Sequence, residues 1–215
     1  MHDTRSLNLR LTEVSSISSG FPQVPKAALN EGAPILQEPG IRPALGLRSI
    51  TPDGDIDFSR LDFVRPPQSS VWRQKLGDVE VRAGDVVAAA RGSSGKAGLV
   101  RTNPKQSLLC TNNVLLIRPN TDRLLPSYLQ VFLQSLYDNP DAGELRRGVL
   151  SQWSITRSDL ETLEIDLPPL DQQQKIAAAF EAVTSARRAA NAISEHYNQL
   201  SQRLSQTYFK HSKRS

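Results

Sequence analysis

The sequence predicts an α/β (α+β) fold in which a β-rich domain is followed by one long C-terminal helix. Two patterns carry this prediction. Between residues 45 and 118, short apolar runs are separated by turn-forming residues, as expected for strands joined by tight turns. From residue 171 onward, apolar and small residues recur at steps of three and four, which is the spacing of an amphipathic helix.

The N-terminal segment, residues 1–41, is expected to be a leader of irregular structure. Leu7, Leu9 and Leu11 alternate with polar residues, a pattern that fits either a short strand or a disordered leader. Five of the fourteen prolines lie within residues 21–45, where they favour irregular backbone. The β-rich domain is therefore expected to span residues 42–169.

Strands are predicted inside this domain where an apolar run follows a turn signal. The turn-forming residues 52–55 predict a hairpin over residues 46–58. The other predicted strands cover residues 79–82, 86–90, 98–100, 113–118 and 165–167. Helical spacing predicts a helix at residues 126–137, which has a proline at a permitted first-turn position, and a short helical turn at residues 158–163.

The start of the long helix is marked by a change from proline to polar residues. Pro168 and Pro169 disfavour helical structure before it. Asp171 is a good N-cap, and Gln174, three residues later, completes a capping-box-like pair. The helix is expected to cover residues 170–210, followed by a tail at 211–215.

A seam of apolar and small residues follows this helix at close to heptad spacing. It consists of Ile176, Phe180, Val183, Ala186, Ala190, Ile193, Tyr197, Leu200 and Leu204. A helix of this length extends about 58 Å. One amphipathic helix that long cannot bury its stripe against the preceding domain alone, so it is expected to dimerise with a partner helix. The alternative is that it folds back on its own domain as two helices.

The single cysteine, Cys110, excludes an internal disulfide and a cysteine-rich zinc site. Because it follows Leu108 and Leu109, it is expected to be a buried structural cysteine rather than a reactive thiol. No apolar run approaches the ~18 residues that would span a bilayer, and no signal-peptide core follows Met1. These features predict a cytoplasmic protein without a membrane partner.

Charge is unevenly distributed along the chain, although the net charge is only +4. Residues 60–118 hold 10 basic and 4 acidic side chains, a net charge of +6. A basic segment suits a polyanion such as DNA. The alternative is a solvated surface that happens to be basic.

A glycine-bracketed loop with flanking cations lies inside this basic segment. It is not a Walker A loop, because Ala90 stands where the first glycine is required and Ala97 follows the lysine. The loop still offers flexible backbone amides between two cations, which suits a DNA phosphate or a base edge. The alternative is a simple connector between strands. The candidate DNA contacts in the loop are Arg91, Ser93, Ser94 and Lys96.

A second candidate loop joins Arg146 and Arg147 to Gln152. Arginine reads guanine and glutamine reads adenine in the major groove, so this loop is expected to contact bases. The neighbouring Trp153 is more readily explained as a core anchor than as a base contact. Additional phosphate contacts are expected from Arg73, Lys75, Arg101 and Lys105, each of which could equally be solvated surface.

Five segments resemble, in the same order, sequence blocks of the DNA-specificity (S) subunits of type I restriction-modification systems. They are a Gly-Asp strand entry, the glycine-bracketed loop, an Asn-strand-Arg-Pro block, a Tyr-Leu helix and a closing Leu-Pro-Pro-Leu block, at residues 84–87, 91–96, 113–119, 126–137 and 148–170. A glutamine follows the last block in this family, and here three follow, Gln172 to Gln174. The likeness extends over residues 45–209.

This resemblance implies a target-recognition domain with a curved, mostly β core, followed by a spacer helix. S subunits usually carry two such domains and two spacer helices, so the chain resembles a half-subunit. The domain is expected to bind double-stranded DNA.

The helix is expected to pair antiparallel with a second copy, as a homodimer, or with a related half-subunit. Two-fold symmetry would then predict a palindromic, two-part DNA target. A DNA adenine methyltransferase (M) subunit, and further a restriction (R) subunit, are the implied partners.

The chain itself is expected to be a non-enzymatic recognition subunit that needs no cofactor or metal. It contains no DPPY- or NPPY-like tetrapeptide, no glycine-rich S-adenosylmethionine loop and no Glu-x-Lys pair. The three histidines do not cluster in the sequence. The alternative function is an interaction or regulatory subunit of a phage-defence complex that does not read DNA sequence. A small nuclease or methyltransferase is disfavoured by the missing motifs.

Overall fold

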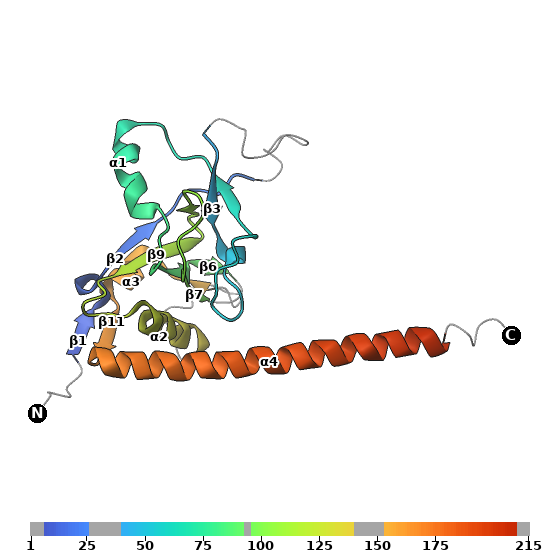
Figure 1. The fold of residues 1–215 in the computed structure, drawn as a ribbon. Helices are drawn as coiled ribbons and strands as arrows, with labels where there is room; N and C mark the ends of the chain where they lie inside the picture. The colour runs from blue at the N-terminus through green and yellow to red at the C-terminus, as the bar shows by residue number, and fades with distance from the viewer. Residues whose placement is uncertain (1–6, 26–39, 93–95, 140–152, 210–215) are drawn as a thin grey trace, which may run out of the picture. The chain divides into compact units, whose positions relative to one another are not determined.

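The computed structural model describes residues 7–25, 40–92, 96–139 and 153–209 (Figure 1). The chain divides into two compact units, residues 1–177 and residues 178–215. The described strands and the shorter helices lie in the first unit, and the long helix begins there. The mixed α/β class that the sequence predicts is confirmed.

The central sheet of the first unit consists of four antiparallel strands. In spatial order they are β2 (Ser15–Ser19), β9 (Val114–Pro119), β5 (Val86–Ala89) and β7 (Ala97–Leu99). Both faces of β5 are buried, because Val86 and Ala88 belong to one apolar cluster and Val87 to another. Burial on both faces explains why the inner strands are continuous apolar runs rather than alternating ones.

Three smaller groups of strands surround this sheet. A three-stranded sheet contains β4 (Asp62–Val64), β3 (Arg42–Leu45) and β8 (Leu109–Cys110), in that order. Two antiparallel pairs join β1 (Leu7–Arg10) to β11 (Glu164–Leu167), and β6 (Arg91–Gly92) to β10 (Trp153–Ser154). Each pair brings together segments that are far apart in the sequence.

Helices cover the two apolar clusters. The α-helices are α1 (Ser70–Val79), α2 (Pro126–Asp138), α3 (Arg157–Thr162) and α4 (Leu170–Phe209), and the 3-10 turns are η1 (Leu11–Glu13) and η4 (Leu47–Ser49). The first cluster includes Leu129 and Leu133 of α2 and Leu160 of α3. The helical predictions for residues 126–137 and 158–163 are confirmed. Among the described helices, none is both long enough and apolar enough to cross a membrane.

The N-terminal segment differs from the irregular leader that was predicted. Of the two structures that its alternating leucines permit, the strand forms: β1 pairs with β11, and β2 forms an edge of the central sheet. Leu11, Val14 and Ile17 are buried in the first cluster. The leader prediction is therefore wrong for residues 7–19. Residues 26–39 lie outside the described part of the chain.

Two further predictions inside the domain are corrected. The strand predicted at residues 79–82 is wrong, because α1 ends at Val79 and Val81 only donates one backbone hydrogen bond, to Leu108 O at 2.8 Å. Val79 and Val81 are nevertheless both buried in the second cluster. The predicted hairpin at residues 46–58 is reduced to one bridge, between Ile50 and Ile56, because η4 occupies its first arm.

Cys110 is fully buried in the second apolar cluster. Its burial raises the pKa of the thiol to about 12, because the thiolate would be removed from water. The protonated thiol is a poor nucleophile, so the prediction of a structural cysteine is confirmed.

The long helix α4 is continuous over 40 residues. This rules out the alternative in which the same residues form two helices. The helix begins at Leu170, so Asp171 lies in its first turn rather than at its N-cap, which corrects the capping prediction. Asp171 there accepts from Lys175 at 3.2 Å. The part of α4 in the second unit exposes Val183, Ile193, Tyr197, Leu200 and Leu204, each at least 45% accessible.

Candidate nucleic-acid interface

The two loops predicted to contact DNA are joined at their bases by one antiparallel ladder. In the β6–β10 pair, Arg91 lies opposite Ser154 and Gly92 lies opposite Trp153. One candidate loop begins immediately after β6, and the other ends immediately before β10. Although about 50 residues separate them in the sequence, both loops therefore meet the sheet at the same place.

Backbone hydrogen bonds tie this ladder to the central sheet. Ile155 N donates to Ala90 O at 2.9 Å, and Ala90 N donates to Asn113 O at the same distance. At the base of the glycine-bracketed loop, Ala89 N donates to Lys96 O at 2.9 Å. The loop bases are consequently part of the hydrogen-bonded sheet rather than free connectors.

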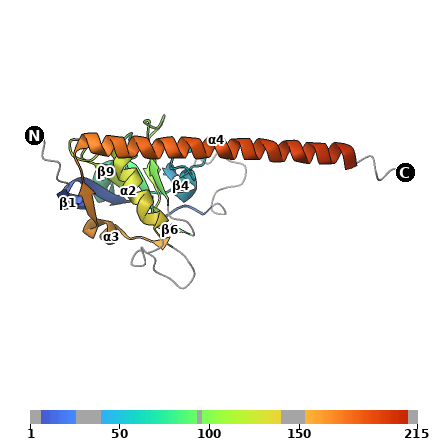
Figure 2. The ribbon, with the colours of Figure 1, turned by 90° about the horizontal axis from the view of Figure 1, so that it is seen from below.

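Three polar side chains of α2 form hydrogen bonds with backbone groups near the ends of the glycine-bracketed loop. The Tyr137 hydroxyl donates to Ala89 O at 2.7 Å, and Gln134 Oε1 accepts from Ala97 N at 3.0 Å. Gln130 Nε2 donates to Gly54 O at 2.7 Å. Burial raises the pKa of Tyr137, so its hydroxyl stays protonated and remains a donor. Figure 2 shows the C-terminal end of α2 beside β6.

These three positions were not singled out in the sequence. The available signal was the spacing of Gln130 and Gln134, which places two amides on one face of an otherwise apolar helix. A buried amide such as Gln130 needs a partner, and both amides find theirs in backbone groups, of Gly54 for Gln130 and of Ala97 for Gln134.

A partly buried ion pair connects two of the sequence blocks that resemble those of S subunits. Arg118 donates to Asp85 through Nε at 2.7 Å and through Nη2 at 2.9 Å, and its Nη2 also donates to Glu80 O at 2.8 Å. The Asp85 carboxylate, 1% exposed, also accepts from Arg82 N. The Gly-Asp and Arg-Pro blocks therefore form one structural unit, in which Gly84 supplies the positive φ of 90° that the turn requires.

The predicted DNA contacts divide into described and undescribed residues. Arg91 is exposed and Lys96 is half-buried, at opposite ends of the same loop. Arg101 pairs with Asp55 at 3.1 Å, and Lys105 is exposed beside a pocket. Five of the other predicted contacts lie outside the described residues: Ser93, Ser94, Arg146, Arg147 and Gln152. Arg73 and Lys75 lie in α1, but their side chains are outside the described part. The contribution of each to DNA binding stays a prediction.

Among the described residues, no three His, Cys, Asp or Glu side chains lie close enough together to hold a metal ion. The polar groups around the loops are hydrogen-bond donors and acceptors that fix backbone. These hydrogen bonds fix the described ends of the two loops on the sheet.

The second glutamine of the Gln172–Gln174 run fixes the start of α4. Gln173 is fully buried, donates through Nε2 to Arg123 O and Pro168 O, and accepts from Leu125 N through Oε1. It therefore links the first turn of α4 to the segment that leads into α2. The family resemblance predicted a glutamine after the Leu-Pro-Pro-Leu block, but the sequence did not indicate which of the three glutamines has this role.

Replacing Gln173 with leucine is expected to lower the free energy of unfolding of the first unit by about 3 kcal/mol, because one buried and two partly buried backbone groups would lose their partner. Gln174→Leu is the matched control, since Gln174 is exposed. It should change the same quantity by less than about 0.5 kcal/mol. Chemical denaturation measures both. Equal effects of the two changes would contradict this role of Gln173.

The comparisons with known proteins agree with the geometry. The model of the type I restriction modification DNA specificity domain matches residues 53–196. A putative type I restriction enzyme MjaX specificity subunit of Methanocaldococcus jannaschii is 28% identical over 128 residues, which cover 58% of this chain and 29% of that protein. The first residues matched by the family model lie before β4 and the last lie within α4.

Solved structures share the fold. A type I restriction-modification system structure superposes with a TM-score of 0.64 at 21% identity, covering 96% of this chain and 45% of that one. The type I S subunit from M. genitalium gives a TM-score of 0.58 at 14% identity, covering 98% of this chain and 47% of that one. The chain spans less than half the length of each of these relatives. It belongs to the family of type I restriction-modification DNA specificity domains.

Proposed function

We propose that this chain is the sequence-recognition component of a type I-like restriction-modification or related DNA-modification assembly. Its first unit binds duplex DNA, and the loops at the β6–β10 ladder reach the bases. The chain directs a partner adenine methyltransferase and performs no catalysis itself. The observation that carries this proposal is the β6–β10 pair, which joins the two cationic loops in a chain of this family.

The local construction of the loops supports base recognition. Their bases are fixed by the central sheet and by α2, so little ordering of the loop ends is required when DNA binds. Arginine and lysine at the ends of the first loop provide charge for phosphates and donors for guanine. The work takes place on DNA inside the cell, which implies a cytoplasmic location.

The exposed apolar seam of α4 supports pairing with a second helix. Ile193 and Tyr197 are 72% and 71% exposed, and Leu200 and Leu204 continue the same seam. Apolar side chains at a and d spacing are stabilised when they interdigitate with those of a facing helix. We infer an antiparallel pair with a second copy of the chain or with a related helix. The pair sets the separation of two recognition units and offers a surface to the methyltransferase, with a restriction subunit as a further partner.

Ile193→Glu combined with Leu200→Glu is expected to weaken self-association by about 100-fold or more, because each carboxylate would be buried in the seam of both copies. Asn198→Glu with Gln202→Glu is the matched control, since it adds the same charge to the opposite face of α4 and should leave association unchanged. Sedimentation equilibrium measures both. A seam variant that associates as tightly as the control would contradict pairing through this face.

Purification of the tagged chain from its native cells tests the partner proposal. Mass spectrometry should then identify an adenine methyltransferase in a defined ratio to the chain. Recovery of only unrelated defence or regulatory proteins would contradict the proposal. It would favour the alternative of an interaction subunit that does not read sequence.

A further inference from the structure

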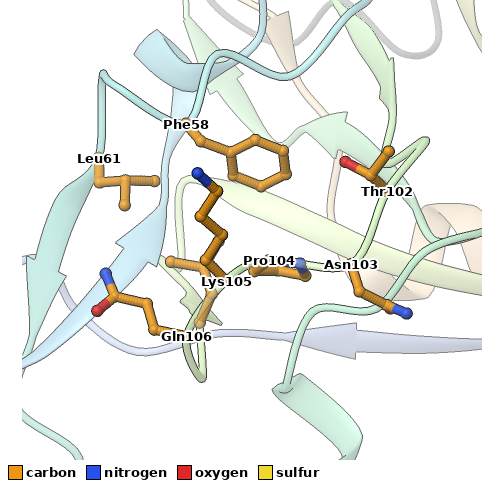
Figure 3. Close-up of a pocket in the computed structure, with 8 residues that line it drawn as sticks. Phe58, Leu61, Thr102, Asn103, Pro104, Lys105 and Gln106 are labelled. Atoms are coloured by element: carbon orange, nitrogen blue, oxygen red, sulfur yellow. The ribbon is translucent and has the colours of Figure 1, made fainter.

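A pocket of about 520 Å³ lies outside the loop region described above (Figure 3). Its walls come from the loop that precedes β4 and the loop that precedes β8. The residues relevant here are Phe58, Leu61, Asn103, Pro104, Lys105 and Leu108. This volume is in the range of sites that bind small organic ligands, about 300–1,000 Å³.

The aromatic wall of the pocket lies on a hydrogen-bonded turn. Asp57 accepts from Ser59 N at 2.9 Å and from the Ser59 hydroxyl at 2.6 Å, and its own N–H donates to Ser49 O at 2.8 Å. The hydrogen bonds from Ser59 lower the pKa of the Asp57 carboxyl, which keeps it ionised. Between these anchors the Phe58 ring is 37% exposed. An accessible aromatic ring is a surface on which a planar group can stack.

The opposite wall provides a cation. Lys105 is exposed, and within the described residues its ammonium makes no hydrogen bond or ion pair. Figure 3 shows it reaching across the opening between Leu61 and Phe58. The nearby arginines are already paired, Arg60 with Asp57 and Arg101 with Asp55. Among the described cations of this mouth, Lys105 is thus the one left for an incoming anion.

We propose that this pocket binds one unstacked nucleotide, with its base against Phe58 and its phosphate at Lys105. Leu61, Pro104 and Leu108 supply the apolar floor under the base. An aromatic ring beside an unpaired ammonium matches both chemical parts of a nucleotide, and this combination recurs in proteins that bind single-stranded nucleic acid. The inference rests on the proposed function and extends it, because the chain then holds an unpaired nucleotide as well as duplex DNA.

The probe is a fluorescent oligothymidylate of about ten nucleotides, which has no duplex to offer. Phe58→Ala and Lys105→Gln are each expected to weaken its binding about tenfold, measured by fluorescence anisotropy. Phe58→Leu keeps an apolar side chain without the ring face, and should bind as weakly as Phe58→Ala. Lys175→Gln removes an exposed lysine of α4 and should bind as the unchanged chain does.

Competition with thymidine monophosphate distinguishes the two sources of a nucleotide. Displacement of the oligonucleotide shows that a free nucleotide suffices. Failure to displace it, together with the loss in the Phe58→Ala variant, shows that the ligand is part of a strand. Either result supports a nucleotide pocket.

Unchanged oligothymidylate affinity in Phe58→Ala would overturn the proposal. A second contrary result uses an environment-sensitive dye bound in the pocket. If an acidic, phenylalanine-containing peptide displaces this dye and the oligonucleotide does not, the occupant is a protein and the proposal is overturned. The Phe58→Ala variant is expected to keep the affinity of the chain for fully paired duplex. If duplex binding depends on Arg91 and Lys96 while Phe58→Ala changes nothing, the DNA-recognition function stands and the pocket inference alone fails.

Discussion

Arg118→Met is expected to lower the free energy of unfolding of the first unit by about 3–5 kcal/mol, which is the cost of leaving a buried charge without its partner. The Asp85 side chain is 1% exposed, and within the described part of the chain its carboxylate would keep only the hydrogen bond from Arg82 N. Glu80 O would also lose its donor. Chemical denaturation followed by tryptophan fluorescence measures the change, because both tryptophans lie in the first unit.

An exposed ion pair provides the control for this effect. Arg157 pairs with Glu161 at 2.6 Å, but the two side chains are 57% and 38% exposed. Arg157→Met should therefore cost less than about 0.5 kcal/mol. Asp85→Asn together with Arg118→Met should recover part of the loss, since no unpaired charge remains. If Arg118→Met cost no more than Arg157→Met, the structural link between the two sequence blocks would be refuted.

Arg91→Glu combined with Lys96→Glu is expected to weaken duplex DNA binding by about 100-fold. Two cations at the ends of one loop are replaced by anions, so contacts with phosphates and base edges are lost and repulsion is added. The slope of log affinity against log salt should fall by about 2, because about two fewer counterions are released. Fluorescence anisotropy with a labelled duplex, repeated over a range of salt concentrations, measures both quantities.

Arg123→Glu with Lys175→Glu makes the same change of charge away from the ladder. Both residues are exposed near the start of α2 and of α4. This control separates a local contact from the general effect of net charge on a polyanion ligand. Equal losses in the two double variants would mean that the loop at β6 makes no specific contribution to DNA binding.

The parts of the fold that could be predicted have strong periodic signals. The apolar run at residues 86–90 and the one at 113–118 are strands because both of their faces are buried. The seam after Pro169 gave a single helix, since no proline or glycine interrupts residues 170–209. In each case local preference and tertiary burial favour the same structure.

The parts that could not be predicted depend on contacts with distant residues. Leu7 and Leu9 form a strand because β11, more than 150 residues later, provides the edge. Residues 70–79 contain a glycine and a weak apolar pattern, yet they form α1. Val79 and Val81 alternate as in a strand, although Val79 ends α1 and Val81 follows it, both buried. A short pattern cannot distinguish these outcomes, because packing decides them.

In the candidate site, too, some features could be predicted from the sequence and others could not. The cations Arg91 and Lys96 could be selected from their loop, because charge next to glycine is visible in the sequence. The pairing of their loop with β10 could not, since it joins two short strands of two residues each. The partners of Gln130, Gln134 and Tyr137 are backbone groups. Every residue type has these groups, so the sequence does not indicate which residues are bound.

The most direct test of DNA recognition is to recover and sequence the duplexes that the chain, with any subunit that co-purifies, retains from a random library. We expect enrichment of one motif in two parts separated by unspecified bases, bound about 1,000-fold more tightly than unrelated duplex. Retention of duplexes without any enriched motif would contradict sequence recognition. It would leave a DNA-binding or interaction subunit that does not read its target.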